Sequence, residues 1–338
     1  MASSVSRTGV LILSELADGA SELSEAQRNR MVLMQLRLEE YDVVKWVSDF
    51  LEGIQETKQE QQRLNVKKLD EKTIGGICKH YSESKNRFFL IDYDGTLVPI
   101  TKVPADAVPV EDVKQFLASM CSDRDNHVAI VSGRDATTLE QWFGYLPITL
   151  VAEHGASLKM RNQSWQQLVT VSEHWKEQVG RIMQLFVTRC VGSFVEEKTN
   201  TLAWHYRNTQ VDLGFTRSRE LINNLSQLIQ NTPLQVIDGN KVVEVRMAGF
   251  DKGTITLRVL NEAKPDFVFC VGDDTTDEDM FKVLEDPSFT PRTYTIKVGN
   301  KGTSAKFTLP SQQQVLPLLR RLQACVKTNK ESLQNSGT

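Results

Sequence analysis

The sequence predicts an α/β protein: a doubly wound parallel sheet with a smaller α+β domain inserted into it. Two observations lead to this prediction. Strand-like and helix-like segments alternate over residues 86–160 and again over 246–322, which is the order that a parallel sheet requires. Between these stretches, over residues 164–245, the order changes to helix, strand, strand, helix, strand, strand. We therefore expect a core built from two separated stretches of chain and an inserted lid.

These patterns divide the 338 residues into four parts. We expect a helical extension and linker at 1–75, the core at 76–163 and 246–325, the lid at 164–245, and a disordered polar tail at 326–338. An apolar stripe at helical spacing marks the extension, formed by Val44, Val47, Leu51 and Ile54, with Trp46 and Phe50 beside it. The polar run at 56–62 then reads as a solvated helix or a linker.

The first strand expected in the core ends in two carboxylates. Residues 88–91 form an apolar run, typical of a strand buried on both faces, and Asp92, Tyr93, Asp94 and Gly95 follow it. Strand alternation directs Tyr93 into the core and away from the two acids. Two crowded carboxylates repel each other unless one is protonated or a cation neutralises them, and Mg2+ is a natural partner. A helix-capping Asp beside a surface turn is the structural alternative.

Two further strands and one helix of the core bring polar groups to the same place. Residues 127–131 precede Ser132 and Gly133, residues 266–271 precede the acidic run 272–279, and Lys252 starts a helix. Ligands of open α/β sheets bind beyond the carboxyl ends of the strands, so we expect these groups to gather there. Taken singly, each has another reading: Ser132 as a helix N-cap, Lys252 as a solvated charge, and the acids as a helix start. All of these groups occurring together in this order indicate a binding site more specifically than any one of them alone.

With these motifs in this order, the chain resembles the haloacid dehalogenase-like phosphohydrolases. Four further segments resemble more narrowly the trehalose-6-phosphate phosphatases, and they lie at 151–156, 194–198, 204–207 and 241–246. The likeness covers about residues 85–325. It departs from the family pattern at 247–250, where the family more often has a proline and smaller residues. That departure includes none of the residues expected to take part in the chemistry.

The resemblance implies hydrolysis of trehalose 6-phosphate to trehalose and phosphate through an aspartyl-phosphate. Asp92 is then the nucleophile, and Asp94 protonates the departing sugar oxygen and later deprotonates the attacking water. We expect Mg2+ on Asp92, on the main-chain carbonyl of Asp94 and on Asp273, with Asp277 supporting these ligands.

The same resemblance assigns groups to the phosphate and to the sugar. Ser132, the Gly133 amide and Lys252 are expected to neutralise the transferring phosphoryl group. The substrate contacts expected around the sugar are Glu196, Lys198 and Glu244, with Arg134 and Arg207 nearby, and Glu153 and His154. From the residues alone, 196–198 also reads as an exposed charge run, and His154 and His205 as structural histidines rather than metal ligands. Closure of the lid is expected to complete the site and exclude water.

Composition and charge limit the other classes of function. The chain is 40% hydrophobic and 25% charged, with a formal net charge of −3, which gives no basic patch for nucleic acid or an anionic membrane. No apolar run approaches the roughly 18 to 20 residues that span a bilayer. Five scattered cysteines without a C-x-x-C motif are expected to be reduced thiols of a cytoplasmic protein.

Residues 9–23 and 39–52 resemble the end of the glucosyltransferase domain that precedes the phosphatase in two-domain trehalose proteins. The body of that domain is absent, so we expect no synthase activity, and a trehalose-6-phosphate synthase subunit stays open as a partner. Two other functions also stay open: a phosphatase for another sugar phosphate such as sucrose 6-phosphate, and a non-catalytic regulatory subunit. The intact catalytic set argues against the regulatory subunit; it comprises Asp92, Asp94, Ser132, Lys252 and Asp273.

Overall fold

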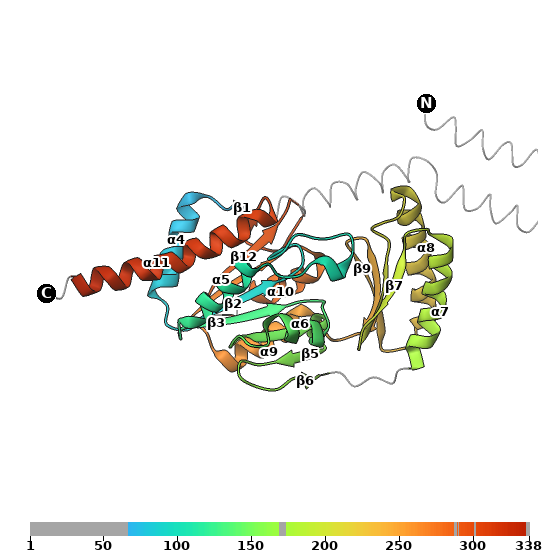
Figure 1. Cartoon of the computed structure of the whole chain (residues 1–338), viewed down its shortest axis with the longest axis horizontal. Helices are drawn as coiled ribbons and strands as arrows, with labels where there is room; N and C mark the ends of the chain where they lie inside the picture. The colour runs from blue at the N-terminus through green and yellow to red at the C-terminus, as the bar shows by residue number, and fades with distance from the viewer. Residues whose placement is uncertain (1–66, 169–173, 287–288, 290, 301, 336–338) are drawn as a thin grey trace, which may run out of the picture. The chain divides into compact units, whose positions relative to one another are not determined.

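The computed structural model divides into two compact units, residues 1–65 and 66–338, and Figure 1 shows the chain. The residues described are 67–168, 174–286, 289, 291–300 and 302–335. The expected helical stripe and the transferase-like segments lie outside these residues. Within them, the core begins earlier than expected, because β1 (Lys67–Lys68) pairs in parallel with β13 (Phe307–Leu309) at one edge of the large sheet.

The core is a nine-stranded sheet in the order β1-β13-β12-β11-β2-β3-β4-β5-β6. Its parallel part runs from β1 to β4, and β5 and β6 are antiparallel. The strand bounds are β2 Arg87–Asp92, β3 Asn126–Val131, β4 Thr149–Ala152, β5 Ser157–Lys159, β6 Gln166–Gln167, β11 Phe267–Gly272 and β12 Arg292–Val298. All six residues of β2 are buried, so the apolar run seen in the sequence is a central strand.

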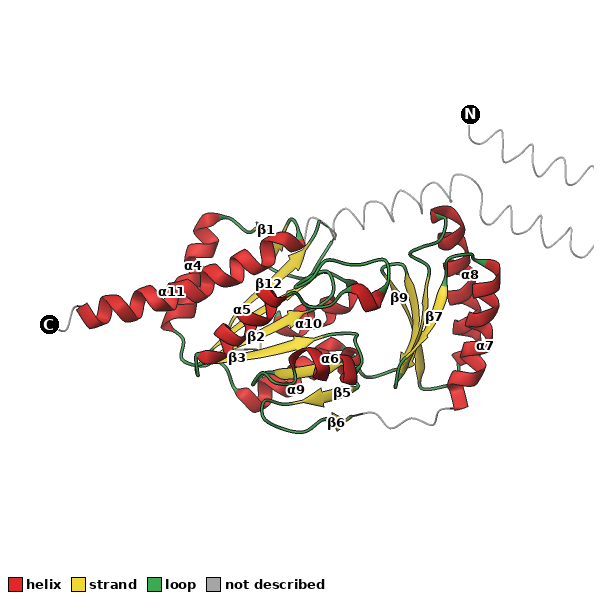
Figure 2. Cartoon of the chain, viewed as in Figure 1, coloured by secondary structure: helices red, strands yellow, loops and turns green. Residues whose placement is uncertain are grey.

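Helices cover both faces of this sheet, as Figure 2 shows. Phe89 and Ile91 of β2 pack into one apolar cluster with α4 (Glu71–Glu83), α5 (Glu111–Ser122), α6 (Ala136–Phe143) and α11 (Val315–Asn335). Phe88 and Leu90 face the other side, toward α9 (Lys252–Ala263) and α10 (Glu278–Leu284). The doubly wound α/β prediction is confirmed. Tyr93 is fully buried as expected, and its hydroxyl donates to the Ala107 carbonyl oxygen at 2.6 Å.

Helix α11 differs from the sequence expectation at its end. It continues to Asn335, although a disordered tail was expected from residue 326. Residues 327–335 include Lys, Glu, Leu and Gln, which favour helix, so the end of the apolar periodicity did not mark the end of the helix. Residues 336–338 lie outside the described part of the chain.

Two cysteines correct the prediction that all five are thiols. Cys78 of α4 and Cys325 of α11 form a disulfide, with their Cα atoms 5.8 Å apart and a sequence separation of 247 residues. Spacing along the chain could not reveal this pair, because only the packing of α4 against α11 brings the two together. Cys121, Cys190 and Cys270 are free and buried.

The lid is a four-stranded antiparallel sheet in the order β7-β8-β10-β9 with two helices on one face. Its elements are α7 His174–Arg189, β7 Phe194–Glu197, β8 Thr201–His205, α8 Val211–Ile229, β9 Leu234–Gly239 and β10 Val242–Met247. This is the helix-strand-strand order expected from the sequence. Val243 and Val245 pack under the helices, so the alternate residue Glu244 belongs to the opposite face. Figure 2 shows that this second face is turned toward the core.

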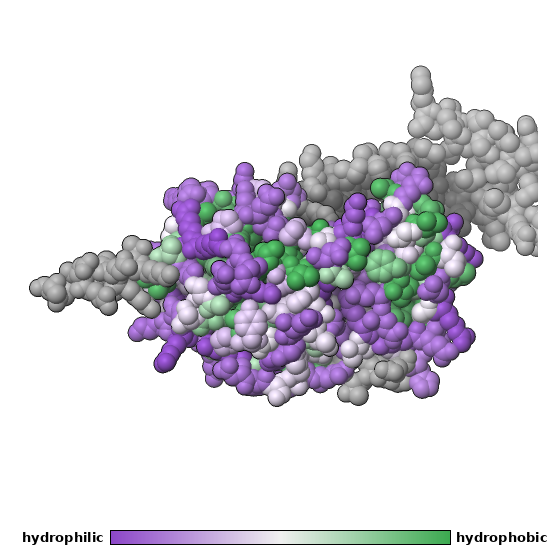
Figure 3. Space-filling view, viewed as in Figure 1, coloured by the Kyte–Doolittle hydropathy of each residue, from purple (hydrophilic) through white to green (hydrophobic). Residues whose placement is uncertain are grey.

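The surface drawn in Figure 3 is mostly hydrophilic, with apolar side chains gathered in a few clusters. Segment 100–110 contributes several exposed apolar residues, among them Val108 and Val110. Within the described residues, no helix combines the length and the apolar character needed to cross a membrane.

Candidate active site

A buried lysine joins two acids at the carboxyl ends of β2 and β11. The Lys252 ammonium lies 2.6 Å from Oδ1 of Asp92 and 2.7 Å from Oδ1 of Asp277. β2 and β11 are neighbours in the sheet, so the residues that follow them share one edge. Burial opposes the charge of Lys252, but the two carboxylates outweigh it and raise its pKa. Lys252 is therefore a protonated cation next to Asp92.

Asp277 uses both carboxylate oxygens on the protein. Oδ1 binds Lys252, and Oδ2 accepts hydrogen bonds from the main-chain amides of Asp273 at 2.8 Å and Asp274 at 2.9 Å. A Cβ at Gly272 would lie 2.3 Å from Cγ of Asp277, so only glycine allows this approach. Asp277 thus fixes the loop after β11 and orients the main chain of Asp273 and Asp274.

Two carboxylate oxygens beside this lysine have no partner. Oδ2 of Asp92 and Oδ1 of Asp273 are buried and without a hydrogen bond in the described part of the chain. Ligand atoms of Asp92, Asp273 and Asp277 lie within 4.8 Å of one another. Burial raises the pKa of Asp92, with Asp277 adding to the effect, and burial likewise raises the pKa of Asp273 to about 7. Unpaired, crowded carboxylate oxygens suit a hard divalent cation.

Asp94 lies apart from this cluster and is held by Arg134. The Arg134 guanidinium donates to both Asp94 oxygens, at 2.8 and 2.6 Å, and to the Pro104 carbonyl oxygen at 2.6 Å. It also lies 5.4 Å from the ring centre of Trp142. The family resemblance predicts Arg134 near the sugar, whereas its ion pair with Asp94 has no signal in the sequence.

Of the two predicted residues in the loop after β3, one lines the cavity and the other does not. Ser132 is fully buried, its hydroxyl accepts the Arg134 amide at 3.1 Å, and it does not line the cavity. Gly133 does line the cavity, and a Cβ there would lie 2.6 Å from Nε2 of His154. Glycine at this position therefore lets His154 approach the loop.

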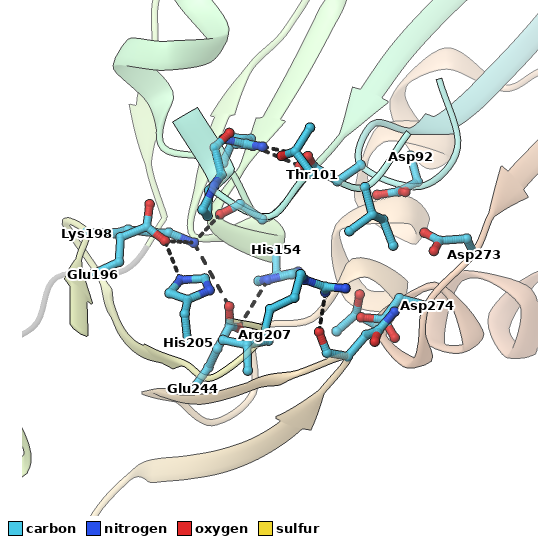
Figure 4. Close-up of a pocket in the computed structure, with 18 of the residues that line it drawn as sticks. Asp92, Thr101, His154, Glu196, Lys198, His205, Arg207, Glu244, Asp273 and Asp274 are labelled. Atoms are coloured by element: carbon cyan, nitrogen blue, oxygen red, sulfur yellow. Dashed lines mark hydrogen bonds and ion pairs between the residues drawn. The ribbon is translucent and has the colours of Figure 1, made fainter. Parts of the chain in front are cut away.

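The lid contributes a row of paired charges. β7, β8 and β10 align Glu196, Ala203 and Glu244 across the sheet, and the small Ala203 separates the two acids. The Lys198 ammonium donates to the Gly133 carbonyl oxygen at 3.0 Å and lies 3.7 Å from Glu196 and 4.0 Å from Glu244. Figure 4 shows these side chains converging from the lid strands on the pocket.

Each glutamate of this row also contacts a histidine. Oε2 of Glu196 is 2.8 Å from Nε2 of His205, and Oε2 of Glu244 is 3.3 Å from Nε2 of His154. Burial lowers the pKa of His154 to about 4, so this histidine is neutral near pH 7. Burial opposes ionisation of Glu244, but His154, Lys198 and Arg246 outweigh it and its pKa is lowered. Both histidines therefore contact a glutamate of the lid, and both line the cavity described below.

Residues of the core and of the lid line an open cavity of about 160 Å3. The residues expected from the sequence that line it are Asp92, Asp94, Gly133, Arg134, His154, Glu196, Lys198, Arg207, Glu244, Lys252 and Asp273. Three others do not: Ser132, Glu153 and Asp277. The other residues that line the cavity were not predicted to do so: Ile100, Thr101, Lys102, Pro104, His205, Asn240, Val242, Asp274 and Thr276.

The sequence around these additional lining residues gave little or no indication that they would lie at the cavity. Segment 98–107 follows the first motif without any periodicity, so nothing indicated that Thr101 and Lys102 turn toward the lid. Asn240 had a signal, because Asp238-Gly239-Asn240 is a typical hairpin-turn sequence, and Asn240 lies in the turn between β9 and β10. Its carbonyl oxygen accepts the Arg207 guanidinium at 2.5 Å.

A protein family and several curated relatives match most of this chain. A sequence model of the trehalose-phosphatase family matches residues 90–313. A bifunctional trehalose-6-phosphate synthase/phosphatase of Thermoproteus tenax is 37% identical over 93% of this chain and 46% of that protein. A trehalose-phosphatase of Saccharomyces cerevisiae is 36% identical over 71% of this chain and 29% of its own. The chain thus spans less than half the length of these relatives.

Solved structures give a similar result for the fold. The C-terminal domain of a trehalose-6-phosphate phosphatase from C. albicans is 33% identical, with a TM-score of 0.71. That match covers 76% of this chain and 97% of the other. The matched part therefore corresponds to a complete domain of that structure.

Proposed function

The chain belongs to the trehalose-phosphatase family, and we propose that it hydrolyses trehalose 6-phosphate to trehalose and inorganic phosphate. One observation carries the proposal: a single cavity is lined by Asp92 and Lys252 of the core and by Glu196, Lys198 and Glu244 of the lid. The core groups suit a phosphoryl group, and the lid groups suit the hydroxyls of a sugar.

The acidic cluster fits a divalent cation, because Asp92 and Asp273 each keep a buried oxygen free of any partner among the described residues. We assign Mg2+ to these two side chains and the main-chain carbonyl of Asp94, with Asp277 holding the loop behind them. When bound, the ion supplies positive charge that offsets the phosphoryl oxygens.

The proposed reaction has two displacements at phosphorus. An oxygen of Asp92 attacks, the bond from phosphorus to the sugar oxygen breaks, and Asp94 gives that oxygen a proton. Water then attacks the aspartyl-phosphate, Asp94 takes a proton from it, and phosphate leaves with Asp92 regenerated. The Lys252 ammonium, 2.6 Å from Asp92, orients the nucleophile and offsets the charge of the transferring group.

Asp94 must exchange partners before it can act. In the structure its carboxylate is held by Arg134, and its side chain is 36% exposed. An incoming sugar oxygen can therefore reach it from the open side of the ion pair. Ser132, buried below the cavity wall, would act on the phosphate only through the loop that it shapes.

The test is phosphate release from trehalose 6-phosphate with Mg2+, with EDTA, and with Mg2+ restored. Glucose 6-phosphate and sucrose 6-phosphate are assayed in parallel, because a phosphatase for another sugar phosphate would prefer one of them. Activity on trehalose 6-phosphate that EDTA abolishes and Mg2+ restores supports the proposal. Equal rates on all three esters, or no hydrolysis at all, contradict it.

Two further expectations stay proposals. A synthase subunit as partner is supported by the fused relative of T. tenax. A cytoplasmic location is supported only by the composition of the sequence, and fractionation of cells that express the chain would test it.

A further inference from the structure

A short turn of the core carries contacts to both the lid and the loop after β3. Glu153, His154 and Gly155 have φ angles of 47°, 57° and 114°. Positive φ is unfavourable for Glu and His, so surrounding contacts must impose it. The amides of Glu153 and His154 donate to the carbonyl oxygens of Arg134 at 2.9 Å and Ser132 at 3.0 Å. The turn is thus fastened to the loop that carries Arg134.

The Glu153 side chain points to the lid and not to the cavity. The residue is 2% exposed and is absent from the cavity wall. Its Oε2 accepts the main-chain amide of Asn200 at 2.6 Å, and its Oε1 accepts the Asn200 side chain at 3.4 Å. Gln167 of β6 donates to the Asn200 side-chain oxygen at 3.1 Å. The core therefore grips Asn200, itself 4% exposed, from two sides.

Asn200 belongs to the lid turn, residues 198–200, which joins β7 to β8. Lys198 starts the same turn, and its ammonium lies on the Gly133 carbonyl oxygen, between Glu196 and Glu244. The Lys198 amide also donates to the Thr201 carbonyl oxygen at 2.9 Å, which closes the turn. Fixing Asn200 therefore fixes where Lys198 enters the cavity.

We propose that Glu153 is a positioning residue that holds the lid turn on the core through Asn200, and not the substrate ligand that the sequence suggested. Through this bond, Lys198 is seated on Gly133, and the same turn of the core holds the carbonyl groups of Ser132 and Arg134. When the lid turn docks on the core, it therefore places Lys198 in the cavity and fixes the loop after β3 at the same time. The kinetic part of this inference rests on the proposed function.

The first test measures amide hydrogen exchange in the empty protein. Glu153→Ala removes both acceptors of Asn200, so exchange in peptides covering 198–201 should accelerate at least about tenfold, the loss expected for a hydrogen bond to a charged group. Peptides covering β2 and β11 should exchange as in the wild type. A residue that only contacts substrate would leave the empty lid turn unchanged.

The second test compares two substrates. Glu153→Ala should raise KM for trehalose 6-phosphate about tenfold or more, because Lys198 is no longer seated. The kcat for p-nitrophenyl phosphate, which has no sugar, should stay within about twofold. Glu153→Gln keeps one acceptor and should recover most of the loss. Glu177→Ala is the matched control, since Glu177 lies on the lid helix α7, is exposed, and pairs with Arg181 rather than with the lid turn.

Exchange in the lid turn that stays at the wild-type rate in Glu153→Ala overturns the inference, whatever the kinetics. Equal losses on both substrates also overturn it. If Glu153→Ala does not fold, both measurements are made on Glu153→Gln. The exchange rate of the lid turn and KM for trehalose 6-phosphate should then change in the same direction as expected for Glu153→Ala, but by less. A wild type that does not hydrolyse trehalose 6-phosphate defeats the proposed function alone, because the exchange measurement needs no substrate.

Discussion

The core wall and the lid wall of the cavity differ in how their charged groups are paired. On the core wall, buried oxygens of Asp92 and Asp273 have no partner among the described residues, and the pKa of each acid is raised. On the lid wall, Glu196 and Glu244 each have a histidine and Lys198 nearby, and the pKa of each acid is lowered.

This difference indicates two kinds of ligand. On the core wall, Asp92 and Asp273 each keep one oxygen without a partner among the described residues, and added positive charge would stabilise both acids. That charge can in turn bind a phosphoryl group. The lid wall is already balanced, so an uncharged hydroxyl can exchange hydrogen bonds with it without leaving a buried charge alone. Chemistry and sugar selection should therefore be separable by mutation.

The largest expected effect comes from the core wall. Asp92→Asn removes the proposed nucleophile, so turnover of trehalose 6-phosphate and of p-nitrophenyl phosphate should both fall at least about 10⁴-fold. Phosphate release is the measurement, with circular dichroism to verify that the variant is folded. Retained turnover on either substrate would show that the core wall does not supply the nucleophile.

The lid wall should give a smaller and selective effect. Glu244→Ala removes a partner of His154 and Lys198, and kcat/KM for trehalose 6-phosphate should fall about 100-fold. For p-nitrophenyl phosphate it should change by less than about threefold, because that ester does not reach the lid. Equal losses on the two substrates would remove the distinction between the walls.

Much of the core wall could be predicted from the sequence, and the reason is geometric. Apolar runs such as 88–91 mark buried parallel strands, whose carboxyl ends meet at one edge of the sheet, so Asp92 and Asp273 had to be neighbours. The lid pattern was also readable, since period-two strands and the turn at 238–240 fix which residues share a face. Glu244 follows from that alternation.

The remaining contacts depend on tertiary packing that no local pattern encodes. Arg134 could have pointed into the cavity or at Asp94, because a long side chain can reach either, and the sequence does not decide between them. Glu153 follows a strand end like the catalytic acids, but positive φ turns it toward Asn200 and away from the cavity. Cys78 and Cys325 pair only because two helices distant in sequence pack together.

Acid should weaken the contact between the walls. His154 has a pKa of about 4 when folded, below its ordinary value of 6.5, so between these pH values the unfolded chain binds more protons. The contribution of His154 to the free energy of unfolding should therefore fall by up to about 3 kcal/mol as pH drops from 6.5 to 4. The raised pKa of Asp273 acts in the opposite direction over this range, so the contribution of His154 has to be measured as a difference between the wild type and a variant. The depressed pKa of Glu244 extends the loss to lower pH, since its stabilisation fades as the acid is protonated.

Urea denaturation across this pH range measures the effect. His154→Gln cannot take up a proton, so as pH drops from 6.5 to 4 its free energy of unfolding should fall less, or rise more, than that of the wild type. An identical slope in both proteins would mean that His154 is not held neutral by its burial between the lid and the core.

The smallest effect on the site should come from the disulfide, which lies outside both walls. Cys78→Ser frees a closed loop of 247 residues and should lower the free energy of unfolding by about 3 to 5 kcal/mol, because the unfolded chain gains conformational freedom. KM and kcat for both substrates should stay within about twofold, since neither cysteine lines the cavity. Thermal denaturation with and without dithiothreitol checks the first statement, and the wild type should lose stability on reduction while Cys78→Ser does not. A change in the ratio of the two substrates' kcat/KM would instead mean that the contact of α4 with α11 reaches the lid, and the separation of the walls would then depend on the packing of the whole core.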